Sequence, residues 1–160
     1  YGKTLGIIGF GRIGHEVAKR ALAFGMTVVA YDIIAIKTDL AVRQVPLDEL
    51  LAAADLVTLH VPKQAKPIIG EAEFARMRDG AIVVNVARGG VVDEKALRAA
   101  LDSGKVRAAA LDVFDKEPPE DFTLVDHPNV IPIPHLGAAA AEGQQRAGLE
   151  AVRILKEKLA

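Results

Sequence analysis

The chain has 160 residues, of which 51% are hydrophobic and 26% charged, and its formal net charge is −1. These values are typical of one globular domain with a sizeable core. They argue against a basic nucleic-acid-binding surface, an anionic-membrane surface and a membrane span of roughly 20 apolar residues. The sequence contains no cysteine, so it forms neither a disulfide nor a thiolate metal site. A cysteine-free chain with no secretory signal pattern predicts a cytoplasmic protein.

The first predicted unit is a strand, a glycine-rich turn, a helix and a second strand, within residues 3–32. Residues 5–8 form an apolar run that is typical of a buried parallel strand. Apolar residues at helical spacing follow the turn and predict a crossover helix. A second apolar run, residues 27–31, predicts the next strand, which ends in Asp32.

The glycine-rich turn has the spacing Gly-x-Gly-x-x-Gly, at Gly9, Gly11 and Gly14. The first glycine permits a tight turn, the second lets a diphosphate approach the backbone, and the third lets the helix lie close to the strand. The amino end of the helix would face the anion. Asp32 stands where a carboxylate accepts hydrogen bonds from both ribose hydroxyls and repels a 2′-phosphate. We therefore predict dinucleotide binding, with NAD preferred to NADP; a purely structural glycine turn is the alternative.

The rest of the chain alternates between predicted strands and helices. Further strands are predicted at 43–45, 55–61, 81–86, 106–113 and 130–134, and helices at 46–51, 71–78, 93–104 and 142–159. This alternation predicts an α/β fold, a doubly wound and mostly parallel Rossmann-like sheet with helices on both faces, in a single domain. Pro132 has no backbone N–H to donate, so the last strand is predicted at an edge. Ligands of such sheets bind at the carboxyl ends of the strands.

Several residues between these motifs have more than one interpretation. The apolar residues 33–36 belong either to the local core or to a wall beside the adenine ring. His60 is expected to be packed in the fold rather than to act as a ligand, and His15 and His127 are expected to face solvent. No group of histidines and carboxylates has the spacing of a metal site, so no metal is predicted.

Three consecutive strands of the predicted sheet are followed by reactive side chains, Arg88, Glu117 and His135 in that order. A guanidinium binds a carboxylate through two hydrogen bonds. An imidazole exchanges a proton near neutral pH, and a carboxylate behind it fixes its tautomer. The set therefore fits a substrate that carries a carboxylate. Taken alone, such an arginine is more often a solvated charge, such a histidine is more often structural, and Glu117 could simply lie on the surface. The spacing does not show that the three meet.

Five long motifs resemble, in the right order, the NAD-binding domain of the D-isomer-specific 2-hydroxyacid dehydrogenases. They are GKTLGIIGFGRIG (2–14), AFGMTVVAYD (23–32), NVARGGVVDEKAL (85–97), AALDVFDKEPP (109–119) and PHLGA (134–138). The resemblance implies an oxidoreductase that transfers a hydride between NAD and a D-2-hydroxy acid. It is strongest to the branch that oxidises D-3-phosphoglycerate. Reductases of glyoxylate or hydroxypyruvate, and a non-catalytic NAD-sensing module like the corepressors of this fold, stay open as alternatives.

The resemblance also implies roles for individual residues. Arg88 corresponds to the arginine that binds the substrate carboxylate, Glu117 to the glutamate paired with the histidine, and His135 to the acid–base. Asp112 corresponds to the residue that receives the carboxamide of NAD. The other implied cofactor contacts are Gly9, Gly11, Arg12, Ile13, Gly14, Asp32, Val61, Pro62, Val86, Ala87, Gly137 and Ala138, together with Arg88 and His135 themselves.

The sequence departs from the family pattern in places. Lys63–Pro67 replaces the usual Leu-Thr-Pro-Glu-Thr, Ile33 replaces a proline, and Ala139 and Ala140 stand where a hydroxyl residue often caps the last helix. Family members also have a substrate domain built from segments before and after this one. We therefore expect residues 1–160 to be an NAD-binding domain excised from a two-domain dehydrogenase, which binds cofactor with little turnover alone. The resemblance further implies a homodimer that pairs through this domain, by the loop at 114–129.

Overall fold

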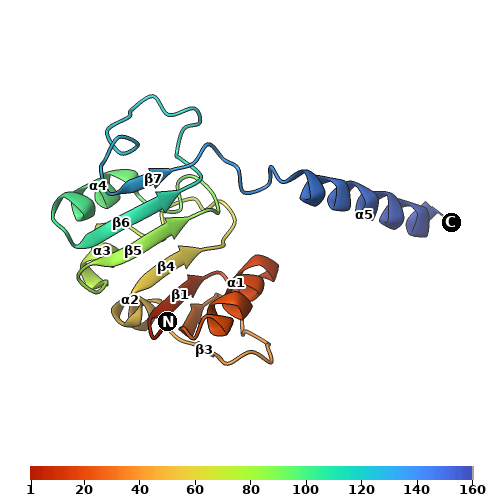
Figure 1. Cartoon of the computed structure of the whole chain (residues 1–160), viewed down its shortest axis with the longest axis horizontal. Coiled ribbons are helices and arrows are strands. Elements are labelled where there is room, and N and C mark those ends of the chain that lie inside the picture. Colours follow the sequence, from red (N-terminus) through yellow and green to blue (C-terminus); the bar gives the residue numbers. More distant parts are fainter. Residues whose placement is uncertain (160) are drawn as a thin grey trace.

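The computed structural model describes residues 1–159, and Figure 1 shows a twisted sheet with one helix standing apart from it. The strands are β1 (Thr4–Ile8), β2 (Thr27–Tyr31), β3 (Val42–Gln44), β4 (Leu56–Leu59), β5 (Ala81–Asn85), β6 (Val106–Leu111) and β7 (Val130–Pro132). The helices are α1 (Arg12–Ala23), α2 (Leu47–Ala53), α3 (Glu71–Arg76), α4 (Glu94–Asp102) and α5 (Ala141–Leu159). Every strand pair is parallel, in the order β3-β2-β1-β4-β5-β6-β7, so the predicted parallel sheet is confirmed.

All of the predicted elements are present, but several strands are shorter than predicted. β4 ends at Leu59 because its partner β1 ends opposite, at Ile8, where the glycine turn begins. β6 ends at Leu111 and β7 at Pro132, so the residues that follow each strand lie in loops at the carboxyl edge. β7 pairs with β6 on one side only, which confirms the edge position predicted from Pro132.

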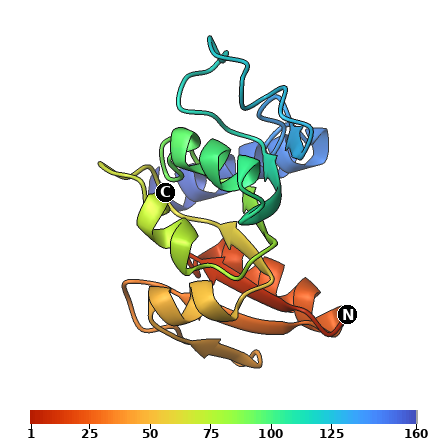
Figure 2. The ribbon, with the colours of Figure 1, turned by 90° about the vertical axis from the view of Figure 1, so that its left-hand side faces the viewer.

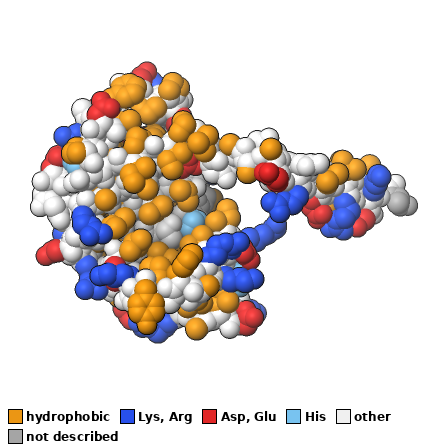
Figure 3. All heavy atoms as spheres, viewed as in Figure 1, with side chains coloured by type: hydrophobic (Ala, Val, Ile, Leu, Met, Phe, Trp, Pro, Cys, Tyr) orange, Lys and Arg blue, Asp and Glu red, His pale blue; other side chains and the backbone are white. Residues whose placement is uncertain are grey.

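The crossover connections place one helix on one face of the sheet and three on the other. α1 joins β1 to β2 and packs on a small core that includes Leu5 and Ile7. α2, α3 and α4 follow β3, β4 and β5 and cover the opposite face, where they lie in front of the strands in Figure 2. On the α1 face the sheet is partly open beyond β1. Ile82, Val84 and Ala110 are half-buried there, and Figure 3 shows hydrophobic side chains across this surface.

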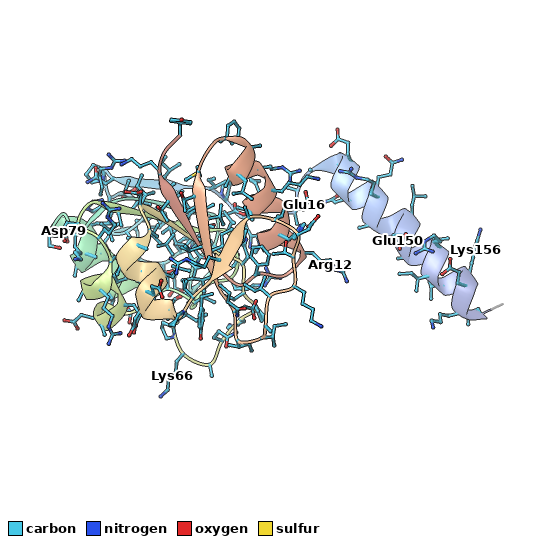
Figure 4. The ribbon with its side chains drawn as sticks, turned by 90° about the horizontal axis from the view of Figure 1, so that it is seen from below. Arg12, Glu16, Lys66, Asp79, Glu150 and Lys156 are labelled. Carbon is cyan, nitrogen blue, oxygen red and sulfur yellow. The ribbon has the colours of Figure 1, made fainter. Side chains whose placement is uncertain are left out.

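α5 confirms the predicted last helix, but it packs against nothing in the sheet domain. None of its residues is buried, and Leu149, Val152 and Leu155 form an exposed apolar stripe. Figures 1 and 4 show the helix extending away from the sheet, with Glu150 and Lys156 clear of the other helices. Neither α5 nor any other helix within residues 1–159 has the length and apolar composition needed to cross a membrane.

One expectation about exposure is wrong, and one interpretation holds only in part. His127 was expected to face solvent, but it is buried, in the loop that leads into β7. Its Nδ1 accepts the Asn129 N–H at 3.1 Å and its Nε2 lies 3.3 Å from Asp102 Oδ1, so both ring nitrogens have partners inside the fold. Ile33 and Ile34, for which the local core was one interpretation, are 89% and 69% exposed, whereas Ile36 packs against the smaller core.

Candidate functional site

The turn between β1 and α1 has no room for side chains at Gly9 and Gly14, but it has open space at Gly11. Gly9 has a φ of +91°, and a Cβ there would lie 2.5 Å from the carbonyl oxygen of His60. A Cβ on Gly14 would overlap the carbonyl oxygen of Gly9. At Gly11, by contrast, nothing lies within 4 Å of the position that a Cβ would take. The turn therefore leaves room for a ligand to approach the backbone at Gly11.

α1 begins at this turn without a capping side chain. Gly11 is the residue before the helix, and no acidic side chain lies in the first turn. The first N–H groups of a helix have no partner within the helix, and its dipole favours an anion at this end. Arg12 adds a positive charge on the outside of the fold (Figure 4), and Ile13 is 65% exposed. The amino end of α1 thus suits a diphosphate.

Asp32 follows β2 and is held by the turn that it faces. Its Oδ2 accepts the Phe10 N–H at 2.7 Å and its Oδ1 accepts the Ile34 N–H at 3.2 Å. These two hydrogen bonds orient the carboxylate but leave acceptor capacity on both oxygens. Two adjacent hydroxyls of a ribose require such a pair of acceptors.

A crevice of about 430 Å³ connects the turn, Asp32 and the segment after β4. The predicted cofactor contacts that line it are Gly9, Gly11, Asp32, Val61 and Pro62. The apolar part of the lining includes Ile33 and Ile68, so an exposed Ile33 fits the interpretation as a wall for an adenine ring. An open Gly11, an uncapped helix end and an oriented carboxylate together fit the adenosine diphosphate half of a dinucleotide.

His60 lies at the inner side of the same crevice. Its Nε2 is 3.1 Å from Thr58 Oγ1, and burial lowers the pKa of its imidazole. The ring is therefore neutral at physiological pH and packed against its own strand, as the sequence led us to expect.

The loops after β6 and β7 bring Glu117 and His135 into contact. Nδ1 of His135 lies 2.7 Å from Oε2 of Glu117, and Oε1 of the same carboxylate accepts the Phe114 N–H at 3.0 Å. The hydrogen bond with His135, followed by that from Phe114, lowers the pKa of Glu117. The carboxylate is therefore ionised and holds Nδ1, which leaves Nε2 for another partner.

A second cavity, of about 460 Å³, lies beside this pair. Asp112, Glu117 and His135 supply its charged and polar side chains. The apolar lining consists of Phe114, Pro118, Pro119, Phe122, Val125, Pro132, Ile133 and Pro134. A mostly apolar cavity with a few converging polar groups is typical of small-molecule sites. Within residues 1–159, no group of three or more His, Cys, Asp or Glu is placed to hold a metal ion.

Asp112 is buried and binds the backbone of the histidine loop, a contact that the sequence did not reveal. Its Oδ1 accepts the Leu136 N–H at 2.6 Å, and its Oδ2 accepts the Gly137 N–H at 2.8 Å. Ala138, the next residue, is exposed. The end of β6 and the segment just after His135 are thus joined through one carboxylate.

Arg88 forms neither a hydrogen bond nor an ion pair with Glu117 or His135 in the described chain. Its Nη1 donates to the carbonyl oxygen of Ala87 at 2.6 Å. Ala87 is buried and Val86 is 39% exposed. Two of the three predicted catalytic side chains therefore meet, and the third points back along its own loop.

The loop that carries Arg88 nevertheless lies against the loop after β6. The side-chain amide of Asn85 stabilises the loop that carries Arg88. Its Nδ2 donates to the Arg88 carbonyl at 3.0 Å, and its Oδ1 accepts the Ala87 N–H at 3.1 Å. A Cβ on Gly89 would overlap the carbonyl oxygen of Phe114. The two loops therefore leave no room for a side chain between them.

Comparison with known proteins relates the chain to one family. Residues 1–137 match the family described as D-isomer specific 2-hydroxyacid dehydrogenase, NAD binding domain. The chain is 53% identical over 162 residues to hydroxypyruvate reductase of Thermotoga maritima, covering 98% of this chain and 53% of that protein. It is 50% identical over 165 residues to D-3-phosphoglycerate dehydrogenase of Methanocaldococcus jannaschii, covering 99% and 32%. The crystal structure of a glyoxylate reductase from Paecilomyes thermophila has a TM-score of 0.91 and 43% identity, covering 97% of this chain and 48% of that one.

The chain thus spans about half of the Thermotoga protein and a third of the Methanocaldococcus protein. The matched family confirms the resemblance read from the motifs and the prediction of NAD as cofactor. The relatives carry the names of enzymes with different substrates, so the substrate is not resolved by them. The chain belongs to the D-isomer specific 2-hydroxyacid dehydrogenase family, as its NAD-binding domain.

Proposed function

We propose that this chain is the cofactor domain of an NAD-dependent dehydrogenase in which a second domain completes the substrate site. The chain covers 53% and 32% of two relatives, which supports a larger parent protein. The observation that carries the proposal is the contact of 2.7 Å between His135 Nδ1 and Glu117 Oε2, at the same edge of the sheet as the crevice. Closure of two domains excludes water and completes a site, so the chain alone is expected to bind cofactor with little turnover.

The crevice residues would hold NAD by its adenosine diphosphate half. Asp32 would accept the ribose hydroxyls, and the backbone at Arg12 and Ile13 would donate to the diphosphate. Val61 and Pro62 would flank the adenosine. When bound, NAD supplies the nicotinamide that exchanges a hydride with the substrate. A 2′-phosphate would be repelled by the Asp32 carboxylate, which favours NAD over NADP.

His135 would move the hydroxyl proton of the substrate. Because Glu117 holds Nδ1, Nε2 is the atom that would take the proton during oxidation and return it during reduction. The Glu117 carboxylate would stabilise the imidazolium that forms. Arg88 would bind the substrate carboxylate through two hydrogen bonds, for which its guanidinium must leave the Ala87 carbonyl.

The substrate that we propose is D-3-phosphoglycerate, oxidised to 3-phosphohydroxypyruvate in serine biosynthesis. Its support is the 50% identity to the Methanocaldococcus enzyme of that name. The 53% identity to the Thermotoga protein supports the alternative, a reductase of hydroxypyruvate or glyoxylate. A non-catalytic NAD-sensing module is a further alternative, and the Glu117–His135 pair is compatible with it.

Steady-state assays of the full-length protein test this proposal. With NADH, we compare the reduction of 3-phosphohydroxypyruvate, hydroxypyruvate and glyoxylate; the largest kcat/KM identifies the substrate. His135→Gln should lower kcat by about 100-fold or more, the size of a general acid–base contribution, and leave NADH affinity unchanged. If the wild-type protein reduces no 2-keto acid, the enzyme proposal fails and the sensing module stands.

We also propose that the parent protein is a homodimer that pairs through this domain, by the loop at 114–129. Two large apolar side chains on and beside this loop are exposed, Phe122 at 53% and Ile131 at 64%. Exposed apolar groups next to an unpaired edge strand are typical of interaction surfaces. In sedimentation experiments at micromolar concentration, the Phe122→Asp variant of the parent protein should be a monomer. If its dimer is as stable as that of the wild type, the loop at 114–129 does not form the interface.

A further inference from the structure

The backbone at His135 has an unusual conformation that its surroundings must maintain. Its φ is +53°, in the left-handed region that residues with a side chain seldom occupy. Such a conformation persists only where neighbouring groups hold it. The N–H groups of the next two residues, Leu136 and Gly137, both donate to Asp112, at 2.6 and 2.8 Å.

We propose that Asp112 is a positioning residue, which binds the backbone just after His135 and thereby sets the imidazole against Glu117. The inference rests on the proposed acid–base function of His135, but the contacts that carry it involve no substrate. It differs from the carboxamide-binding role that the family resemblance implies for Asp112. Both oxygens of this carboxylate already accept backbone N–H groups in the structure.

Asp112 is placed rigidly enough for this role. It is 3% exposed, it directly follows β6, and its own N–H donates to the carbonyl oxygen of Asn85 at 2.9 Å. Hydrogen bonds to a charged acceptor are among the stronger ones in proteins. The carboxylate therefore holds the histidine loop in a fixed position relative to the end of β6.

The segment 112–117 holds the histidine loop at two points. Asp112 at its start binds the loop backbone, and Glu117 at its end binds the imidazole. Glu117 is itself fixed by the N–H of Phe114 in the same segment. If the hydrogen bonds from the loop backbone to Asp112 are lost, the imidazole of His135 moves relative to Glu117. The contact between Glu117 and His135 then weakens.

Gly137 allows Asp112 to approach this closely. A Cβ added to Gly137 would lie 2.9 Å from Oδ2 of Asp112, so in Gly137→Ala either the carboxylate or the loop must shift. That substitution disturbs the same contact while it leaves the charge of Asp112 in place. It therefore provides a second variant, independent of Asp112→Asn.

The test measures the pKa of the Glu117 carboxyl by carbon-13 NMR in the 160-residue chain. In the wild type the contact with His135 lowers this pKa. If Asp112 positions the ring, Asp112→Asn raises the pKa of Glu117 toward the ordinary glutamate value of about 4.3. Loss of a nearby negative charge alone would shift it down, not up, so the sign separates positioning from simple electrostatics.

Gly137→Ala should also raise the pKa of Glu117, and it keeps the test decisive if Asp112→Asn does not fold. Asp126→Asn is the matched control, because Asp126 is an exposed carboxylate in the loop before β7. It should leave the pKa of Glu117 unchanged. A pKa of Glu117 that stays at the wild-type value in the folded variants overturns the proposal.

Titration of the same variants with NAD separates the two roles of Asp112. A tenfold or larger loss of NAD affinity in Asp112→Asn, with the Glu117 pKa unchanged, would assign Asp112 to the carboxamide and overturn the proposal. A raised Glu117 pKa supports positioning whatever the NAD affinity does. Failure of the acid–base function itself would appear elsewhere, as undiminished turnover of His135→Gln in the full-length protein.

Discussion

The carboxylates of the site are all held by backbone N–H groups. Asp32 accepts the N–H of Phe10, Glu117 accepts that of Phe114, and Asp112 accepts two from the histidine loop. Backbone donors in turns can fix a charged oxygen without a neighbouring cation. The turns at the carboxyl edge of the sheet therefore determine where these three carboxylates lie.

Replacement of Asp32 by Ala tests the ribose assignment. Because two hydrogen bonds to a charged acceptor are lost, NAD affinity should fall by about 10- to 100-fold in calorimetric titration. NADP should bind about as well as NAD, since the carboxylate no longer repels the 2′-phosphate. Asp39→Ala, an exposed aspartate in the following loop, is the control. Titrations with both cofactors that match the wild type would refute the assignment.

The sequence predicts those candidate site residues whose geometry is determined within one short segment of the chain. Gly9, Gly11 and Asp32 could be placed from one strand–turn–helix–strand unit, because the turn and the strand end determine their geometry. The pairing of Glu117 with His135 depends on two loops from different strands, so spacing did not show it and only the family resemblance implied it. The hydrogen bonds of Asp112 to the backbone had no sequence signal, because any residue can supply an N–H.

The ends of secondary-structure elements were predicted well where a particular side chain determines them. A helix was predicted to begin at Asp93, and the Asp93 Oδ1 accepts the Ala96 N–H at 2.9 Å at the start of α4. Strand ends were less accurate, because a strand ends where its partner's ladder ends. The strand around β4 was predicted to continue to Val61, but its pairing with β1 stops at Ile8 and Leu59.

Asp55, directly before β4, links the starts of two neighbouring strands. It accepts the Thr4 N–H at 2.8 Å, and this bond, with smaller contributions from Lys3 and Arg78, lowers its pKa. A lowered carboxyl pKa stabilises the fold above the unfolded value of about 3.9, and that contribution is lost as the pH falls through the folded pKa.

Asp55→Ala should therefore reduce the free energy of unfolding by about 1–2 kcal/mol at pH 7. The difference from the wild type should shrink below about pH 4, where the wild-type carboxyl becomes protonated. Urea denaturation at a series of pH values measures it, with Asp39→Ala as a control that should match the wild type. A difference that stays constant down to pH 2 would show that charge on Asp55 does not contribute.

The whole molecule consists of a well-covered sheet face, a partly open one and a helix that touches neither. The larger core under α2, α3 and α4 contains the fully buried Leu50, Leu59 and Leu97. On the open face the apolar side chains of β5 and β6 are only half-buried. Periodicity predicted α5, but a pattern within one helix does not say which surface its apolar side contacts.

Removal of residues 141–160 should leave the stability of the sheet domain unchanged. No residue of α5 is buried, so no core contact is lost. We expect the Tm to change by less than about 2 °C, which corresponds to less than roughly 1 kcal/mol for a domain of this size. A larger drop in differential scanning calorimetry of the dilute chain would mean that α5 packs on the sheet in solution.

In the proposed complex with NAD, a diphosphate lies against the backbone at Gly11, at the amino end of α1. Gly11 has a φ of −76° and open space where a Cβ would project, so Gly11→Ala should leave the Tm unchanged. The methyl group would nevertheless occupy the place of the diphosphate, and NAD affinity measured by calorimetry should fall about tenfold or more. Gly14→Ala, whose Cβ would overlap the Gly9 carbonyl, should instead lower the Tm. If Gly11→Ala is as stable as the wild type and binds NAD equally well, the dinucleotide does not bind at this turn.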